Sequence, residues 1–144
     1  MFNSILVVCI GNICRSPLGE RLFKQALPEK KISSAGIAAL VGYPPDESAV
    51  LIASKNNISL AGHRARQLTR SLCQENDLIL VMEKKHIEAI CRISPESRGK
   101  IMLLGYWLDQ LEINDPYQKN IEIFENTFHQ IEAATHKWIT ALKQ

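Results

Sequence analysis

Residues 5–17 read ILVVCIGNICRSP, and the rest of the chain is organised around this stretch. Its first four residues form a continuous apolar run rich in β-branched side chains, which is typical of a strand covered on both faces. Gly11 and Asn12 tolerate backbone angles that most residues avoid. Ser16 is a good N-cap, and Pro17 suits the first position of a helix. The stretch therefore predicts a buried strand, a tight loop and the start of a helix.

The chemistry of this loop comes from Cys9 at its beginning and Arg15 at its end. Backbone N–H groups at the start of a helix form a concavity that binds anions. A cysteine attacks as the thiolate, and a ring of N–H donors beside a guanidinium favours that form. The planar fork of an arginine matches two oxygens of a phosphate. The loop is thus predicted to hold a phosphate while Cys9 attacks the phosphorus, although an ordinary turn with a structural cysteine is the alternative.

Length and composition set limits on the class of protein. The 144 residues are predicted to form one domain, residues 1–144, with 46% hydrophobic residues and a net charge of only +2. This charge argues against nonspecific binding of nucleic acid, and no apolar run approaches the roughly 20 residues of a membrane span. The first strand begins too early for a signal peptide, so we expect a cytoplasmic protein. Its cysteines should then be reduced thiols: Cys9, Cys14, Cys73 and Cys91.

Helical and strand patterns alternate along the chain. Strands are predicted over residues 5–8, 32–35, 77–82 and 101–104. Helices are predicted over residues 17–27, 46–57, 83–93 and 121–142, with a helical turn around 71–75. This order predicts an α/β fold, a three-layer sandwich in which helices flank a central four-stranded parallel sheet on both faces. Ligands in such folds bind at the carboxyl ends of strands, where Cys9 lies.

Transfer of a phosphoryl group to a cysteine also needs a proton donor for the departing oxygen. The predicted loop over residues 105–120 offers Asp109, Glu112 and Asp115. Asp115 is favoured because Pro116 restricts its backbone and because Tyr117 can place an aromatic face beside the site. The alternative is that Asp115-Pro116-Tyr117 is only an exposed turn.

Taken together, the chain resembles a low-molecular-weight protein tyrosine phosphatase. The matching features are the loop 9–16, Ser34-Ala35-Gly36, Pro44-Pro45-Asp46, His63-Arg64-Ala65-Arg66-Gln67, Asp77-Leu-Ile-Leu-Val-Met82 and Asp115-Pro116-Tyr117. They occur in family order and cover nearly the whole chain. The resemblance implies the phosphotyrosine protein phosphatase I-like fold and hydrolysis of phosphotyrosine, with no metal or cofactor.

The resemblance also assigns roles by position. Cys9 would be the nucleophile, Arg15 the phosphate clamp, and Asp115 the general acid and then the general base. Asn12 would hold the loop through an unusual backbone conformation, supported by Ser34. Ser16 would donate a hydrogen bond to the sulfur of the nucleophile. The remaining N–H groups for the phosphate would come from Ile10, Gly11, Ile13 and Cys14.

Two details resemble the bacterial members of this family. Residues 38–41 are aliphatic where animal members usually carry a large aromatic side chain, and Gln118 stands where many relatives have a second aromatic residue. Leu40 and Tyr117 would then grip the phosphotyrosine ring. Residues 40–42, 82–88 and 95–100 are also similar to the bacterial subgroup. This likeness implies a role in exopolysaccharide or capsule production, with an autophosphorylated membrane tyrosine kinase as the protein substrate, without membrane insertion of this chain.

Some alternatives stay open. Cys14 either fills space in the loop or, as the resemblance implies, forms a reversible disulfide with Cys9 under oxidation. A thioredoxin-coupled arsenate reductase shares the loop, but it needs two further cysteines close in sequence, whereas Cys73 and Cys91 lie far apart. A non-catalytic phosphotyrosine-binding module would not need Cys9, Arg15 and Asp115 together. The four histidines are interpreted as structural or surface residues: His63, His86, His129 and His136.

Overall fold

A parallel four-stranded sheet lies at the centre of the computed structural model, which describes residues 2–143. Its strands are β1 (Ser4–Cys9), β2 (Lys31–Gly36), β3 (Leu78–Val81) and β4 (Ile101–Leu103). They are hydrogen-bonded in the order β2-β1-β3-β4, and all neighbours run parallel. The predicted sheet is therefore confirmed, with β1 between β2 and β3.

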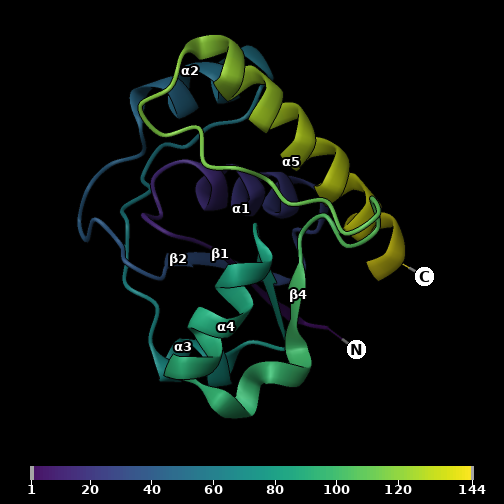
Figure 1. Ribbon diagram of the computed structural model, residues 1–144. Coiled ribbons are helices and arrows are strands. Elements are labelled where there is room, and N and C mark those ends of the chain that lie inside the picture. Colours follow the sequence, from purple (N-terminus) through teal and green to yellow (C-terminus); the bar gives the residue numbers. More distant parts are fainter. Residues whose placement is uncertain (1, 144) are drawn as a thin grey trace.

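Helices cover both faces of this sheet. They are α1 (Arg15–Ala26), α2 (Glu47–Lys55), α3 (Arg70–Glu75), α4 (Lys84–Ile93) and α5 (Ile121–Leu142), with a 3-10 helix η1 at Pro95–Lys100. Figure 1 shows α1, α2 and α5 on one side of the sheet and α3 and α4 on the other. The predicted three-layer sandwich is thus confirmed. None of the helices that the structure describes is long and apolar enough to cross a membrane.

The alternation of side chains along β1 builds the two halves of the core. Ile5 and Val7 point into the layer of α1 and α5, where they belong to a cluster with Leu18 and Phe128. Leu6 and Val8 point to the other face, into a cluster with Cys73, Cys91 and Ile90 from α3 and α4. All four β1 side chains are fully buried, so the continuous apolar run follows from a strand that has no solvent-exposed face.

The first helix begins differently from the prediction. Ser16 is not an N-cap, because α1 already begins at Arg15 and Cys14 occupies the capping position without a side-chain hydrogen bond. The hydroxyl of Ser16 instead contacts Cys9 and Asn12 within the loop. By contrast, Asp46 caps α2, since its side chain accepts a hydrogen bond from the N–H of Ser48.

Strand order creates a crevice at the carboxyl end of β1. The chain moves from β1 to β2 on one side and later returns to β3 on the other side of β1. Loops that leave the carboxyl ends of two such strands diverge, and this topological switch point is where parallel α/β sheets bind ligands. The segments after β1, β2, β3 and β4 all emerge at this edge, which is where Cys9 ends β1.

Candidate active site

The loop after β1 directs its backbone carbonyl groups to neighbouring segments. The pairs are Cys9 O with Ile37 N, Ile10 O with Ala38 N, Gly11 O with Leu40 N, Asn12 O with His63 Nε2, and Ile13 O with Asp46 N, at 2.7–3.1 Å. Within residues 2–143, the N–H groups of residues 10–14 donate to no protein acceptor. Because the carbonyls are held outward, these N–H groups remain as donors for an anion in the cavity that the loop lines.

Asn12 shapes this loop from within. Its φ of 61° lies in the left-handed region that Asn enters more readily than most residues. Its side chain is fully buried and uses both ends: Oδ1 accepts from the N–H of Arg66 at 2.9 Å, and Nδ2 donates to Ser16 at 2.7 Å and to Ser34 at 3.1 Å. His63 must donate from Nε2 to the carbonyl of Asn12, because a carbonyl only accepts.

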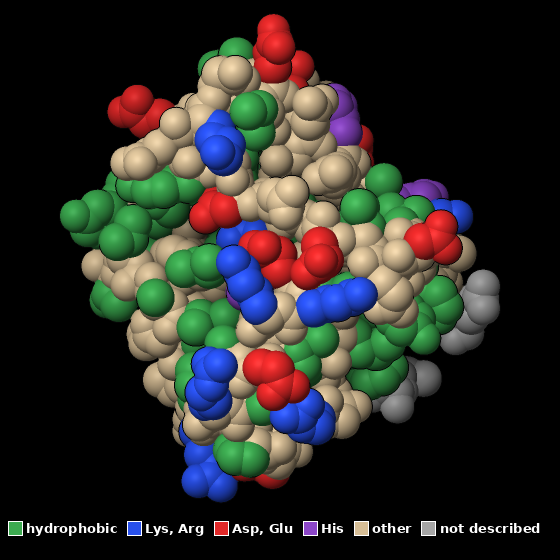
Figure 2. Space-filling model, in the orientation of Figure 1, with side chains coloured by type: hydrophobic (Ala, Val, Ile, Leu, Met, Phe, Trp, Pro, Cys, Tyr) green, Lys and Arg blue, Asp and Glu red, His purple; other side chains and the backbone are tan. Residues whose placement is uncertain are grey.

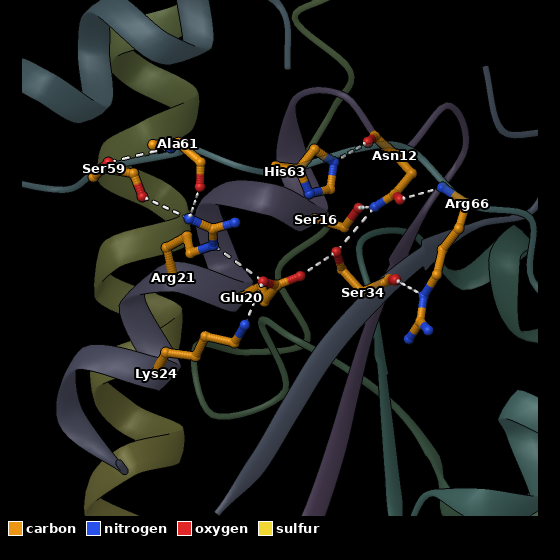
Figure 3. A network of polar contacts seen from close by, with 10 residues as sticks. All are labelled: Asn12, Ser16, Glu20, Arg21, Lys24, Ser34, Ser59, Ala61, His63 and Arg66. Atoms are coloured by element: carbon orange, nitrogen blue, oxygen red, sulfur yellow. Dashed lines mark hydrogen bonds and ion pairs between the residues drawn. The ribbon is translucent and has the colours of Figure 1, made fainter. Parts of the chain in front are cut away.

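A hydrogen-bond chain with only one possible assignment of donors connects Glu20 with Cys9, and Figure 3 shows the part of it from Glu20 to Ser16. Ser34 donates to the carboxylate of Glu20 at 2.5 Å and therefore accepts from Nδ2 of Asn12. The other proton of Nδ2 goes to Ser16 Oγ, which leaves the Ser16 hydroxyl proton to donate to Sγ of Cys9 at 2.9 Å. A donor aimed at this sulfur stabilises the thiolate, which is the form that attacks.

Glu20 gives this chain a charged end. Burial would raise the pKa of Glu20, but hydrogen bonds from Ser34, Lys24 and Arg21 outweigh it and hold the pKa below its usual value. Arg21 also donates to the backbone carbonyls of Ser59 and Ala61 (Figure 3). The charged end of the chain is therefore held in place from α1 and from the segment after α2.

Arg15 is buried beneath the loop, with 1% of its surface exposed. Its Nη1 donates to Oε2 of Glu83 and to the carbonyl of Ile113, both at 2.7 Å. These two bonds use both protons of Nη1. In the described part of the chain, neither Nε nor Nη2 donates a hydrogen bond. Nη2 does face Oδ2 of Asp115, but at 3.6 Å the two atoms are too far apart for a good hydrogen bond. Arg15 can therefore offer Nε–H and Nη2–H as a two-pronged fork to a phosphate.

Asp115 brings a carboxylate to the same place from the loop after β4. Its Oδ2 lies 3.6 Å from Nη2 of Arg15, and Oδ1 accepts from the N–H of Tyr117 at 3.1 Å. The other two candidate acids do not join it. Glu112 accepts from the N–H of Lys84 at the start of α4, and Asp109 is absent from the residues that line the cavity.

The predicted site residues surround one cavity of about 190 Å³. Its lining consists of Cys9, Ile10, Gly11, Asn12, Ile13, Cys14, Arg15, Ala38, Leu40, Asp115 and Tyr117. Ser16 and Ser34 are buried behind this lining. A larger hollow of about 820 Å³ lies around Ser4, Lys24 and Lys31, but its lining contains no cysteine. The cavity over Cys9 is therefore the one that joins a nucleophile, an anion cradle and a carboxylate.

Apolar side chains adjoin the cavity on one side. The loop between β2 and α2 projects at the left of Figure 1, and Figure 2 shows hydrophobic side chains gathered at that edge, beside a band of charged ones. Val41 and Tyr43 of this loop are exposed, at 65% and 58%. Leu40 from this loop and Tyr117 from the loop after β4 both line the cavity. Together they give the cavity an apolar entrance suited to an aromatic ring.

The cysteines differ in their surroundings. Cys9 and Cys14 are free thiols buried in the loop, and Cys73 and Cys91 are free thiols buried in the core. Burial, together with the nearby Cys9, raises the pKa of Cys14 well above its usual value, so Cys14 stays protonated at neutral pH. Among the described residues, no three His, Cys, Asp or Glu side chains converge into a metal site.

Several residues of the site were missed by the sequence analysis. Glu20 and Arg66 hold the loop through Ser34 and Asn12, and Glu83 holds Arg15. His63 donates to the carbonyl of Asn12, a contact that its position in the sequence does not indicate. Glu83 carried a usable signal, because it follows the apolar strand β3 and must emerge at the same sheet edge as Cys9. Glu20 gave only a weak one, since a single carboxylate on a helix is usually exposed.

Comparisons with known proteins agree with this geometry. A family model described as "Low molecular weight phosphotyrosine protein phosphatase" matches residues 4–144. The probable low molecular weight protein-tyrosine-phosphatase AmsI of Erwinia amylovora is 57% identical over 144 residues, which cover 100% of both chains. Wzb of Escherichia coli K12, a low molecular weight protein-tyrosine-phosphatase, is 51% identical over 142 residues, 99% of this chain and 97% of Wzb.

A solved structure shows the same similarity in three dimensions. The crystal structure of the tyrosine phosphatase Wzb from Escherichia coli K30 in complex with sulphate superposes with a TM-score of 0.97. The two chains are 53% identical, and the match covers 99% of each.

Proposed function

The chain belongs to the low molecular weight phosphotyrosine protein phosphatase family, and on this premise we propose that Cys9, Arg15 and Asp115 hydrolyse phosphotyrosine through a cysteinyl-phosphate intermediate. The observation that carries this proposal is the single cavity that these three residues share with the free N–H groups of the loop. A cavity of about 190 Å³ with an apolar entrance suits a phosphorylated phenol better than a bare phosphate.

In the first step, the thiolate of Cys9 attacks the phosphorus, and a sulfur–phosphorus bond forms. The bond between the phosphorus and the phenolic oxygen breaks, and Asp115 gives that oxygen a proton, so that tyrosine leaves neutral. The loop N–H groups and the free fork of Arg15 stabilise the negative charge on the transferring group. The Ser16 hydroxyl stabilises the sulfur before the attack and after its later release.

In the second step, water replaces the cysteine. Asp115, now a carboxylate, takes a proton from the water as its oxygen attacks the phosphorus. The sulfur–phosphorus bond breaks, Cys9 departs as a thiolate, and inorganic phosphate and a protonated Asp115 remain. The net reaction consumes one water and one phosphotyrosine and yields tyrosine and phosphate.

We further propose that the protein substrate is an autophosphorylated membrane tyrosine kinase of exopolysaccharide or capsule production, met in the cytoplasm. The similarity to Wzb and AmsI supports this choice. The entrance also fits, because the slot between Leu40 and Tyr117 opens beside the exposed side chains of Val41 and Tyr43. A flexible tyrosine-rich segment can enter such a slot without unfolding a domain.

Parallel assays on phosphotyrosine and phosphoserine peptides, without added metal, test this function. We expect hydrolysis of the phosphotyrosine peptide, and Cys9→Ser should lower turnover by at least about 1,000-fold while oxyanions still bind. Cys91→Ser, which alters a buried cysteine in the other core cluster, is the matched control. Substantial turnover by Cys9→Ser would eliminate the covalent mechanism, and a preference for phosphoserine would contradict the proposed substrate class.

The protein substrate needs its own test. The purified enzyme should remove phosphate from an autophosphorylated kinase of this class with a higher kcat/KM than from a phosphotyrosine peptide of unrelated sequence. Equal values for the two substrates would contradict the proposed partner without touching the reaction itself.

A further inference from the structure

His86 holds a buried nitrogen that the reaction described above leaves unexplained. The residue lies in the first turn of α4 and is 2% exposed. Its Nε2 is buried and has no hydrogen-bond partner within residues 2–143. A buried polar group without a partner is destabilising by about 1–3 kcal/mol, so its presence calls for a role.

The position of the proton on this ring follows from its other nitrogen. Nδ1 of His86 accepts from the backbone N–H of Glu83 at 3.3 Å. A ring nitrogen that accepts carries no proton, so the neutral ring carries its proton on Nε2. Burial, assisted by the charge of Arg15, lowers the pKa of His86 to about 4, and the ring is therefore neutral at pH 7.

The Nε2 proton faces the carboxylate that anchors Arg15. Nε2 lies 3.5 Å from Oε2 of Glu83, and the same Oε2 accepts from Nη1 of Arg15 at 2.7 Å. The separation of 3.5 Å is longer than a good hydrogen bond. Oε2 of Glu83 thus has one close side-chain donor, the guanidinium of Arg15. The second side-chain donor, Nε2–H of His86, lies a few tenths of an ångström beyond the distance of a good hydrogen bond.

We propose that His86 is a positioning residue for phosphoryl transfer, which keeps Glu83 in place when the phosphate of the substrate draws Arg15 toward the cavity. As Nη1 moves away from Oε2, this carboxylate oxygen would lose part of its close hydrogen bond. A small shift then lets the Nε2–H of His86 donate to the same oxygen, so that Glu83 stays where it aligns Arg15. This inference rests on the proposed role of Arg15 as the phosphate clamp.

Two substitutions separate this role from the capping of α4. In His86→Gln, the longer side chain can place an N–H near the site of Nε2 and donate to Glu83. In His86→Asn, Oδ1 replaces Nδ1 and preserves the bond from the Glu83 N–H, but the side chain is too short to reach Oε2. A merely structural cap therefore predicts that His86→Asn behaves like the wild type, and the positioning role predicts that His86→Gln does.

The measurement is kcat/KM for phenyl phosphate together with the inhibition constant of vanadate, with thermal unfolding recorded in parallel. We expect His86→Asn to lose about tenfold to 100-fold in kcat/KM, as for a lost hydrogen bond to a charged group, and to bind vanadate correspondingly less tightly. His86→Gln should stay within about threefold of the wild type. His136→Asn, at an exposed histidine on α5, is the control. Equal activities of the two His86 variants, whether high or low, would overturn the proposal.

A double-mutant cycle tests whether the effect passes through Glu83. Once Glu83→Ala has removed the carboxylate, His86→Asn should lower kcat/KM no further. An additional tenfold loss in the double variant would overturn the proposal. These failures differ from failure of the proposed function, in which the wild-type enzyme itself would not hydrolyse phosphotyrosine.

Discussion

Oδ2 of Asp115 lies 3.6 Å from Nη2 of Arg15, on the free side of a guanidinium whose Nη1 is already committed to Glu83 and Ile113. The other oxygen of Asp115 accepts from the N–H of Tyr117. The two carboxylate oxygens thus have different partners, and the one facing Arg15 is placed to serve a group bound by that arginine.

Replacing Asp115 by Asn should therefore affect poor leaving groups most. The amide cannot protonate the departing oxygen, so kcat/KM, which reports the steps up to transfer of the phosphoryl group onto Cys9, should fall by about 100-fold or more for phenyl phosphate. The decrease should be much smaller for p-nitrophenyl phosphate, whose phenolate leaves without a proton. Glu112→Gln is the control, because Glu112 binds the start of α4 instead. Equal losses on both substrates would argue against Asp115 as the acid.

Gly36 tests the fit between β2 and the loop. A Cβ at this position would contact the carbonyl oxygen of Ile10 and Cβ of Asn12 too closely, and backbone would have to move. We expect Gly36→Ala to displace the anion cradle and to lower kcat/KM by about tenfold or more. Gly99→Ala places the same methyl group in open space and should leave activity unchanged. Unaltered activity of Gly36→Ala would show that the cradle tolerates this shift.

Ser34 tests the hydrogen-bond chain from Glu20 to Cys9. Ser34→Ala removes the acceptor of Asn12 and the donor to Glu20, both buried, and should lower the free energy of unfolding by about 1–3 kcal/mol. It should also lower turnover, because Asn12 then orients Ser16 less firmly. Urea unfolding and kcat for phenyl phosphate measure the two effects. Ser33→Ala, at the neighbouring residue of β2, should change neither quantity, and a matching loss there would point to a general weakening of the strand.

The stability of the protein should depend on pH through His86. Its pKa is about 4 in the folded chain against an ordinary 6.5, so the unfolded chain binds a proton first as the pH falls. The stabilisation of the folded chain that depends on a neutral His86 is complete above pH 6.5 and is lost as the pH falls toward 4. Between pH 7 and 4.5, the wild type should lose about 2 kcal/mol more of unfolding free energy than His86→Gln. His63, whose pKa burial also lowers, contributes equally to both proteins. Parallel curves for the two would contradict the burial of a neutral His86.

Much of the fold was predictable because its signals are local. The apolar runs of β1 and β3 mark strands covered on both faces, and the spacing of Phe124, Phe128 and Trp138 marks the inner face of α5. Both depend on burial patterns that the sequence carries directly. The prediction of Ser16 as a helix cap was wrong, because the hydrogen bonds of its hydroxyl with Asn12 and Cys9 form only in the folded loop.

By itself, the sequence determined the candidate nucleophile, the arginine that follows it and the acid, because each sits in a recognisable local pattern at Cys9, Arg15 and Asp115. Only the tertiary structure decided what holds them. Glu83 reaches Arg15 from the segment after β3, His86 on α4 faces Glu83, and Glu20 reaches Asn12 through Ser34 on β2. Hydrogen bonds between residues so far apart in the chain depend on the order of the strands, and no local pattern records which side chains a parallel sheet will bring to its carboxyl edge.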